Sequence, residues 1–143
     1  MTEIERKFLV HLNSIPANAD VMEIVQGYLV TGDPELRVRE WNGRYWMAVK
    51  AGKGVVRTEV EVELDPADGK QLLDLCVHRV VKTRYHVGRW ELDVFHGKHS
   101  GLVLMEQELP HPDAELDPLP PEVVVLREVT DEPEYANKNL AQK

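Results

Sequence analysis

Charged side chains recur at every second position in six segments of this chain. In a β-strand, residues two apart project from the same face, so each set would share one face of a strand. The sets are Glu3, Glu5 and Lys7; Arg37 and Arg39; Glu59, Glu61 and Glu63; Lys82 and Arg84; Glu91 and Asp93; and Glu106 and Glu108. Most sets carry a single sign of charge, and mostly apolar residues fill the positions between their members.

Sets of one sign suit two kinds of chemistry. Carboxylate oxygens are the ligands that hard divalent cations take, while Arg and Lys bind phosphate oxygens, Arg in a bidentate manner. On a single strand, the usual interpretation is a charged face in contact with solvent. Over six strands we favour an enclosed site, because like charges on one strand gain nothing from each other and surface ion pairs contribute only about 0–1 kcal/mol.

The elements that must position these residues are mainly strands. Alternating patterns predict eight of them, at 3–10, 21–30, 35–41, 44–50, 55–64, 78–87, 89–95 and 102–109. Asn42-Gly43 lies between two of these segments and is typical of a type I′ hairpin turn. A helix is predicted from a cap at Asp65 to about Cys76, and another in the tail toward Leu140.

The fold class follows from this order of elements. No alternation of the βαβ kind is present, so we expect an α+β fold that is mainly antiparallel. Eight strands can close into a barrel with an interior, which would enclose the charged face. We therefore expect one domain over 1–143, with an eight-stranded closed β-barrel at about 1–110, a few flanking helices, a linker at 111–121 and a helical tail at about 122–143.

Composition narrows the partners and the compartment. The formal net charge of −8 argues against nucleic acid binding, which depends mainly on Lys and Arg. The N-terminus lacks the apolar core of a signal peptide, and the longest aliphatic run, 123–126, is too short to span a bilayer. We therefore expect a cytoplasmic protein with no membrane partner. A single cysteine, Cys76, excludes an internal disulfide.

Several motifs in order along the chain resemble one known family. The segment Glu3-Ile4-Glu5-Arg6-Lys7-Phe8 carries a Glu-x-Glu-x-Lys signature at the N-terminus. The later matches are Gln26-Gly27-Tyr28-Leu29, Arg37-Val38-Arg39, Lys50, Arg57-x-Glu59-x-Glu61, Lys82-Thr83-Arg84-Tyr85, Glu106-x-Glu108 and Tyr135-Ala136-Asn137-Lys138-Asn139-Leu140-Ala141. Together they cover essentially the whole chain and are similar to the CYTH superfamily, the triphosphate tunnel metalloenzymes, in particular its small bacterial members. The proline-containing linker departs from the more helical stretch of that family.

The resemblance implies an eight-stranded tunnel in which acidic residues hold Mg²⁺ or Mn²⁺ and basic residues hold a triphosphate. The residues assigned to metal are Glu3, Glu5, Glu106 and Glu108. Those assigned to phosphate are Arg37, Arg39, Lys50, Lys82 and Arg84. Those assigned to catalysis are Lys7, which would contact phosphate or moderate the acidic cluster, and Glu59, Glu61 and Asp93, from which a carboxylate would orient the attacking water. The general base is left open among them.

The implied activity is hydrolysis of inorganic tripolyphosphate to pyrophosphate and phosphate. Thiamine triphosphatase and class IV adenylate cyclase are the enzymatic alternatives, and a cyclase should need an extra aromatic or amide-rich pocket that the sequence does not identify. A non-catalytic polyphosphate- or nucleotide-binding module would keep the basic set and tolerate loss of the carboxylates. Both sets are present, which favours catalysis. The expected partner is a small molecule that contains a triphosphate, and homodimer formation is left open.

Overall fold

A computed structural model describes residues 2–52 and 56–143 of the chain, without the side chains of Thr2, Glu3 and Val56. The described strands are β1 (Thr2–Leu12), β2 (Asp20–Val30), β3 (Glu35–Trp41), β4 (Arg44–Ala51), β5 (Val56–Leu64), β6 (His78–Val87), β7 (Trp90–Phe95), β8 (Val103–Glu108) and β9 (Val123–Glu128). The helices are α1 (Pro66–Leu75) and α2 (Asn137–Gln142), with short 3₁₀ turns η1 (Gly97–His99) and η2 (Pro133–Tyr135). None of these helices is long and apolar enough to cross a membrane.

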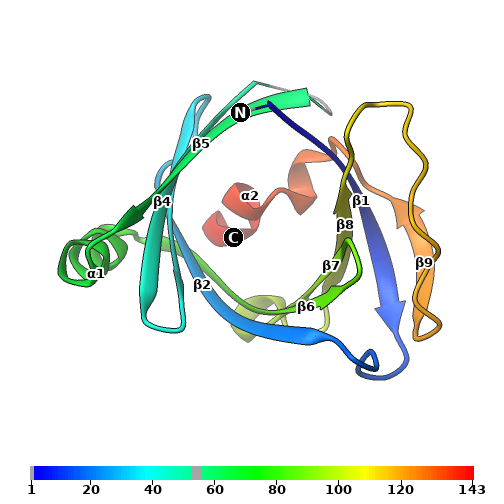
Figure 1. The fold of residues 1–143 in the computed structure, drawn as a ribbon. Helices are drawn as coiled ribbons and strands as arrows, with labels where there is room; N and C mark the ends of the chain where they lie inside the picture. Colours follow the sequence, from blue (N-terminus) through cyan, green and yellow to red (C-terminus); the bar gives the residue numbers. More distant parts are fainter. Residues whose placement is uncertain (1, 53–55) are drawn as a thin grey trace.

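The strands form one antiparallel sheet in the order β5-β4-β3-β2-β6-β7-β8-β1-β9. Figure 1 shows the sheet strongly curved, with α1 on its outer side and α2 within the curve. Every ladder in the sheet is antiparallel, as the sequence pattern predicted. The α+β, mainly antiparallel class is therefore correct.

The prediction of an eight-stranded closed β-barrel is wrong. The described part of the chain forms nine strands in one sheet. This sheet meets itself only over a short ladder, in which residues 2–4 of β1 pair with residues 56–58 of β5. Farther along the same edge, residues 8–12 of β1 pair with β9 instead. The strand β9 thus occupies the edge that an eight-stranded closure would have required.

The predicted helical tail at about 122–143 also needs correction. Its first part is β9, which pairs with β1 from Val123 opposite Leu12 to Glu128 opposite Phe8. Val, Ile and Leu runs that follow prolines fit a short strand better than a helix. Only the end of the tail is helical, at η2 and α2.

Local sequence signals explain the hairpin and the first helix. Asn42 and Gly43 have φ angles of 54° and 75°, as a type I′ turn between β3 and β4 requires. The Asp65 carboxylate accepts a hydrogen bond from Ala67 N at 3.1 Å, and Pro66 opens α1. A Cβ on Gly69 would lie 2.3 Å from Tyr45 Cβ, so only glycine lets α1 pack this closely on β4.

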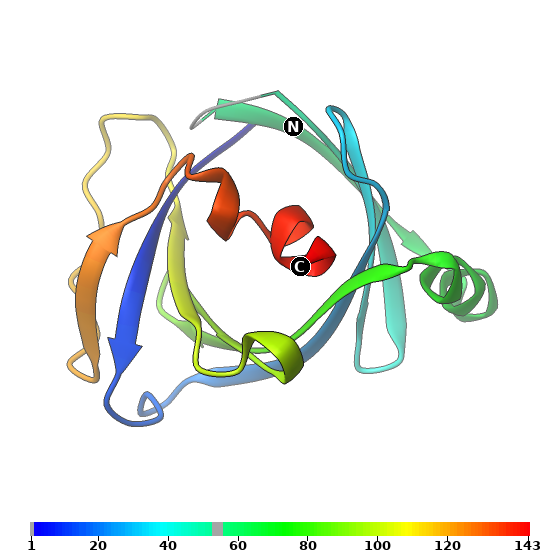
Figure 2. The same cartoon turned by 180° about the vertical axis from the view of Figure 1, so that it is seen from behind.

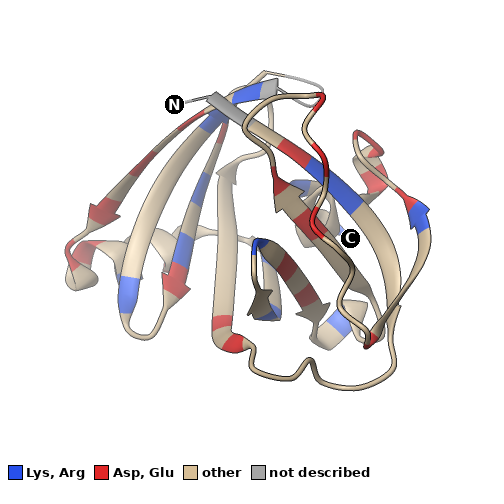
Figure 3. Cartoon of the chain, turned by 45° about the vertical axis from the view of Figure 1, so that its right-hand side comes forward, with Lys and Arg blue, Asp and Glu red and all other residues tan. Residues whose placement is uncertain are grey.

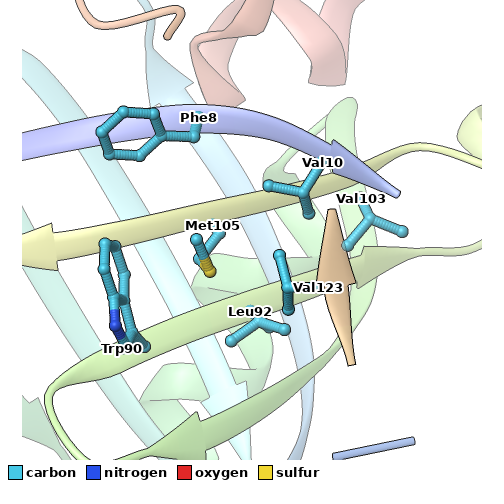
Figure 4. Close-up of a cluster of buried hydrophobic side chains, with 7 residues drawn as sticks. All are labelled: Phe8, Val10, Trp90, Leu92, Val103, Met105 and Val123. Carbon is cyan, nitrogen blue, oxygen red and sulfur yellow. The ribbon is translucent and has the colours of Figure 1, made fainter. Parts of the chain in front are cut away.

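Apolar side chains on the outer side of β1, β7 and β8 form one of the main clusters of the core. Figure 4 shows this cluster, which consists of Phe8, Val10, Trp90, Leu92, Val103, Met105 and Val123. Phe8, Trp90, Leu92 and Met105 alternate with charged residues, so they lie on the opposite face of the sheet from the charges. Strand β9 covers the cluster, and the Trp90 indole N–H donates to Pro118 O at 2.9 Å. The linker at 111–121 therefore helps to cover an outward-facing core.

A second cluster lies on the inner side of the sheet and includes α2. Tyr28, Val80, Phe95 and Leu104 pack with Leu140 of this helix. The last carbonyl groups of α2 contact η1: the Lys98 ammonium donates to Ala141 O at 2.7 Å, and the His99 ring is 2.6 Å from Leu140 O. Figure 2, from the opposite side, again places the C-terminus within the curve of the sheet.

Candidate active site

The charged sets converge on one cavity inside the curve of the sheet. Figure 3 shows basic and acidic positions recurring along the neighbouring strands. The cavity has a volume of about 190 Å³, and we call it the charged cavity. Its walls consist of Glu5, Lys7, Gln26, Tyr28, Glu35, Arg37, Arg39, Lys50, Arg57, Glu59, Lys82, Arg84, Glu91, Glu106, Glu108, Ala136, Asn137 and Lys138.

The charge of these walls differs from that of the whole chain. Among the described residues that line the cavity, eight are Lys or Arg and six are Glu, which gives a formal excess of two positive charges. The chain as a whole carries a formal charge of −8. Positive charge is therefore concentrated where it can act on an enclosed anion.

Strand register brings the acidic residues of β1, β7 and β8 together. Glu5 lies opposite Glu108 and Lys7 lies opposite Glu106 in the β1–β8 ladder. Glu91 lies opposite Glu106 in the β7–β8 ladder. The Lys7 ammonium is 3.9 Å from a Glu106 carboxylate oxygen. One wall of the cavity is thus a carboxylate cluster with a lysine at its border.

The facing wall comes from β3, β4 and β5 and mixes both signs. The Arg37 guanidinium is 3.5 Å from Glu59, and the Lys50 ammonium is 3.8 Å from the other oxygen of the same carboxylate. Lys50 is also 3.9 Å from Glu5 across the cavity. The Arg39 guanidinium donates to Glu61 at 2.9 Å. Arg37, Arg39 and Lys50 all line the cavity, so this wall presents three cationic groups to a bound phosphate.

Lys82 and Arg84 on β6 share the carboxylate of Asp93 on β7. The Lys82 ammonium donates to Asp93 at 2.8 Å, and Arg84 donates at 2.7 and 2.9 Å. Burial alone would raise the pKa of Asp93, but the two cations hold it well below its usual value. Burial lowers the pKa of Lys82 to about 8, although Asp93 opposes this change. Asp93 is therefore an anchor that orients two basic groups.

The pKa values of Glu91 and Glu106, the two other carboxylates near Arg84, shift in opposite directions. Burial, together with the negative charges of Glu106 and Asp93, raises the pKa of Glu91 to about 7 in spite of Arg84. Burial would also raise the pKa of Glu106, but Lys7 and Arg84 lower it overall. Crowded carboxylates that repel one another in this way are stabilised by an added cation.

The C-terminal segment contributes the remaining wall. The Asn137 side-chain oxygen accepts a hydrogen bond from Lys82 at 3.2 Å, and Lys138 also lines the cavity. The Lys7 ammonium donates to Tyr135 O at 3.2 Å. The tail therefore positions two of the lysines that the sequence assigned to the site.

Most of the assigned residues meet in the cavity. Those that line it are Glu5, Lys7, Arg37, Arg39, Lys50, Glu59, Lys82, Arg84, Glu106 and Glu108. Glu61 does not line the cavity but pairs with Arg39 from a more exposed position. Asp93 lies buried behind the lining, between Lys82 and Arg84. The side chain of Glu3 lies outside the described residues, so its assignment stays a prediction.

Sequence reasoning assigned no role to several residues that line the cavity. These are Gln26, Tyr28, Glu35, Arg57, Glu91, Asn137 and Lys138. Glu91 was grouped with Asp93 on one face but was given no role. Glu35 could have been found, because it lies two residues before Arg37 on the same strand face. Arg57 likewise precedes Glu59 by two. The contribution of Lys138 had no comparable signal, because it depends on how the tail folds back into the sheet.

The acidic wall suits a magnesium or manganese ion. Among the described residues, no group of three or more His, Cys, Asp or Glu is already arranged as a metal site. Mg²⁺ typically takes one or two carboxylates and completes its coordination with water and substrate phosphate. The Glu5–Glu108 pair with the neighbouring Glu106 provides such a partial oxygen donor set. These residues therefore fit a metal that is completed by a bound phosphate.

Comparisons with known proteins relate this chain to two inorganic triphosphatases. No family model matches the sequence. The chain is 38% identical to an inorganic triphosphatase of Nitrosomonas europaea, over 99% of this chain and 97% of that protein. It is 35% identical to an inorganic triphosphatase of Acetivibrio thermocellus, over 98% and 93%.

The similar solved structures include that of an inorganic triphosphatase. The crystal structure of the inorganic triphosphatase NE1496 matches with a TM-score of 0.67 and 35% identity, over 100% of this chain and 96% of that one. A conserved hypothetical protein from Pyrococcus furiosus, 19% identical with a TM-score of 0.52, shares the fold. The chain therefore belongs to the inorganic triphosphatase family, as its resemblance to the CYTH superfamily predicted.

Proposed function

We propose that this protein hydrolyses inorganic tripolyphosphate to pyrophosphate and phosphate in the charged cavity, in a reaction that depends on Mg²⁺ or Mn²⁺. The observation that supports it best is the excess of cationic groups in the cavity of an acidic chain, next to paired carboxylates. The names of the two curated relatives support the same activity.

The basic residues bind and neutralise the phosphate chain. Arg37 and Arg39 approach it from β3, Lys82 and Arg84 from β6, and Lys50 from β4. Phosphoryl transfer requires little covalent chemistry from the protein, so positioning and charge neutralisation supply most of the acceleration. Asp93 holds Lys82 and Arg84 in place and so acts as a positioning residue.

The acidic residues Glu5, Glu106 and Glu108 hold the divalent cation, directly or through water. When bound, the ion would neutralise charge on the phosphate oxygens and help to activate water. Glu59 is a candidate to orient that water, because its Oε2 atom is buried without a hydrogen bond among the described residues, although Lys50 is 3.8 Å away. Glu61, which pairs with Arg39 outside the lining, supports the arginine instead.

A substrate panel tests this function. Phosphate release from tripolyphosphate, ATP and thiamine triphosphate, and cyclic AMP formation from ATP, would be measured side by side with Mg²⁺, with Mn²⁺ and with EDTA. The expected result is the highest kcat/KM for tripolyphosphate, no cyclic AMP, and no turnover in EDTA. Dominant cyclic AMP formation, or full activity in EDTA, would overturn the proposal. Binding of tripolyphosphate without turnover would favour the non-catalytic module. A cytoplasmic location stays a prediction, and homodimer formation stays open.

A further inference from the structure

A group of hydrogen-bonded side chains lies on the outer face of β6, behind two of the basic residues of the cavity. The Thr83 hydroxyl oxygen is 3.0 and 2.9 Å from the two carboxylate oxygens of Glu23 on β2. It is also 2.6 Å from Nε2 of His96, which follows β7. We call Glu23, Thr83 and His96 the outer-face cluster. None of the three lines the charged cavity.

The direction of these hydrogen bonds follows from the chemistry of the groups. An ionised carboxylate only accepts hydrogen bonds, and a threonine hydroxyl carries a single proton. Thr83 therefore donates to Glu23, and its oxygen accepts a hydrogen bond from the His96 ring. His96 must then carry a proton on Nε2. The cluster is thus a chain of hydrogen bonds that runs in one direction, from His96 through Thr83 to Glu23.

The cluster joins three strands at the middle of β6. Glu23 on β2 is the ladder partner of Thr83, and His96 directly follows Phe95, the last residue of β7. The backbone N–H of His96 also donates to Val81 O of β6 at 2.9 Å. Strand β6 lies between β2 and β7 in the sheet, so the cluster holds it to both neighbours by side chains as well as by the ladders.

Thr83 lies between Lys82 and Arg84 in the sequence. Successive residues of a strand project from opposite faces, so these two cations point into the cavity while Thr83 points outward. All three residues are no more than 7% exposed, and both cations contact Asp93. A shift of the backbone at Thr83 would therefore move both cations relative to the carboxylate that orients them.

The cluster lies where the outer face of the sheet is open. Elsewhere apolar packing holds this face: Val38 of β3 lies in one cluster with Leu73 of α1, and Leu92 of β7 lies in another with residues of β9. Val81, on the outer face of β6, is instead half-exposed. Hydrogen bonds around Thr83 therefore fix β6 where apolar packing is weaker.

We propose that the outer-face cluster positions two basic residues for phosphate binding. Through the hydrogen bonds of Thr83 it fixes the middle of β6, so that Lys82 and Arg84 keep their contacts with Asp93 and face the phosphate chain. This inference rests on the proposed triphosphatase function and extends the residues on which that function depends to the outer face of the sheet. The cluster acts through β6 and makes no contact with the substrate.

The variant Thr83→Val tests this role, because valine keeps the shape of threonine but lacks the hydroxyl. The expected result is a fall of about ten-fold in kcat/KM for tripolyphosphate, since a misplacement of about 1 Å can cost about 100-fold. Thr83→Ser keeps the hydroxyl and should recover most of the activity. Thr58→Val is the matched control, because it makes the same replacement at an exposed outer-face position of β5. Its kcat/KM should stay within about two-fold of the wild type.

A spectroscopic measurement separates positioning from stability. Arg84 Nε donates to Asp93 at 2.7 Å, so the chemical shift of the Arg84 Nε–H group in a proton–nitrogen NMR spectrum reports this contact. Without any ligand, the signal should move in Thr83→Val and keep its wild-type position in Thr58→Val. An unchanged kcat/KM or an unchanged Arg84 signal in Thr83→Val would overturn the proposal, and a lower Tm as the sole effect would reduce the cluster to a structural role.

A double variant tests whether the cluster acts as one unit. His96→Ala removes the donor to Thr83, so adding it to Thr83→Val should lower kcat/KM by no more than about two-fold further, because effects within one hydrogen-bond network are not additive. Losses that multiply would overturn the joint role of the two residues. If the wild type hydrolyses tripolyphosphate and Thr83→Val is equally active, this inference fails alone. If the wild type does not hydrolyse tripolyphosphate, the proposed function itself fails, and the Arg84 signal alone decides the positioning of β6.

Discussion

Replacing Asp93 with asparagine removes the carboxylate that bridges two buried cations. Asp93 is 4% exposed, and its oxygens accept three hydrogen bonds of 2.7 to 2.9 Å from Lys82 and Arg84. Asparagine keeps the shape but loses the charge and directs N–H donors at one of the cations. Removing one partner of a buried pair typically costs about 3–5 kcal/mol. For a domain of this size, that corresponds to a fall of about 10–17 °C in Tm.

Thermal unfolding followed by circular dichroism measures this change, with Glu63→Gln as the control. Glu63 forms an exposed pair with Arg44, so its replacement should change Tm by no more than about 3 °C. Tripolyphosphate without metal should raise the Tm of Asp93→Asn more than that of the wild type, because the polyanion replaces the missing carboxylate. A variant that unfolds at the wild-type temperature, or gains no extra stabilisation from tripolyphosphate, would refute the role of Asp93 as an anchor.

Three further predictions concern residues that line the cavity. Glu5→Gln and Glu108→Gln should each lower kcat by about 100-fold or more while tripolyphosphate binding by calorimetry persists; full activity of both with Mg²⁺ would contradict the metal assignment. Arg39→Ala should reduce kcat/KM by about 10- to 100-fold through loss of a charged contact, and an unchanged value would remove Arg39 from the site. The pKa of Lys82 is lowered to about 8, so Lys82 loses its charge as the pH rises through 8. Tripolyphosphate affinity should therefore fall above that pH, and Lys82→Arg should abolish this fall.

The strands were predictable because, in most of them, one face carries charged residues and the other carries apolar residues. All eight predicted strands begin and end within about two residues of the observed strands, because apolar and charged positions alternate along them. Among the strands of the described residues, β9 was not predicted, although its run Val123-Val124-Val125-Leu126 is rich in β-branched residues. Its pairing with β1 depends on a contact between the two ends of the chain. A local pattern cannot reveal such a contact, and the error in closure followed from it.

The site was predictable to the extent that it depends on strand alternation. Glu5, Arg37 and Glu106 share a cavity because each lies on the inner face of its strand. Asp93 has the same alternation, but its depth behind Lys82 and Arg84 is a matter of three-dimensional packing. Lys138 reaches the cavity from a tail that folds back within the sheet. The sequence therefore indicates which face the residues share, while the structure distinguishes those that line the cavity from those behind it.

A crystal structure grown with tripolyphosphate and Mn²⁺ would test most directly whether the inward-facing charges form the site. The phosphate groups should lie inside the cavity, in contact with Arg37, Arg39 and Arg84, and the anomalous signal of manganese should lie beside Glu5 and Glu108. Phosphate and manganese bound on the outer surface of the sheet, with the cavity filled by solvent alone, would contradict it.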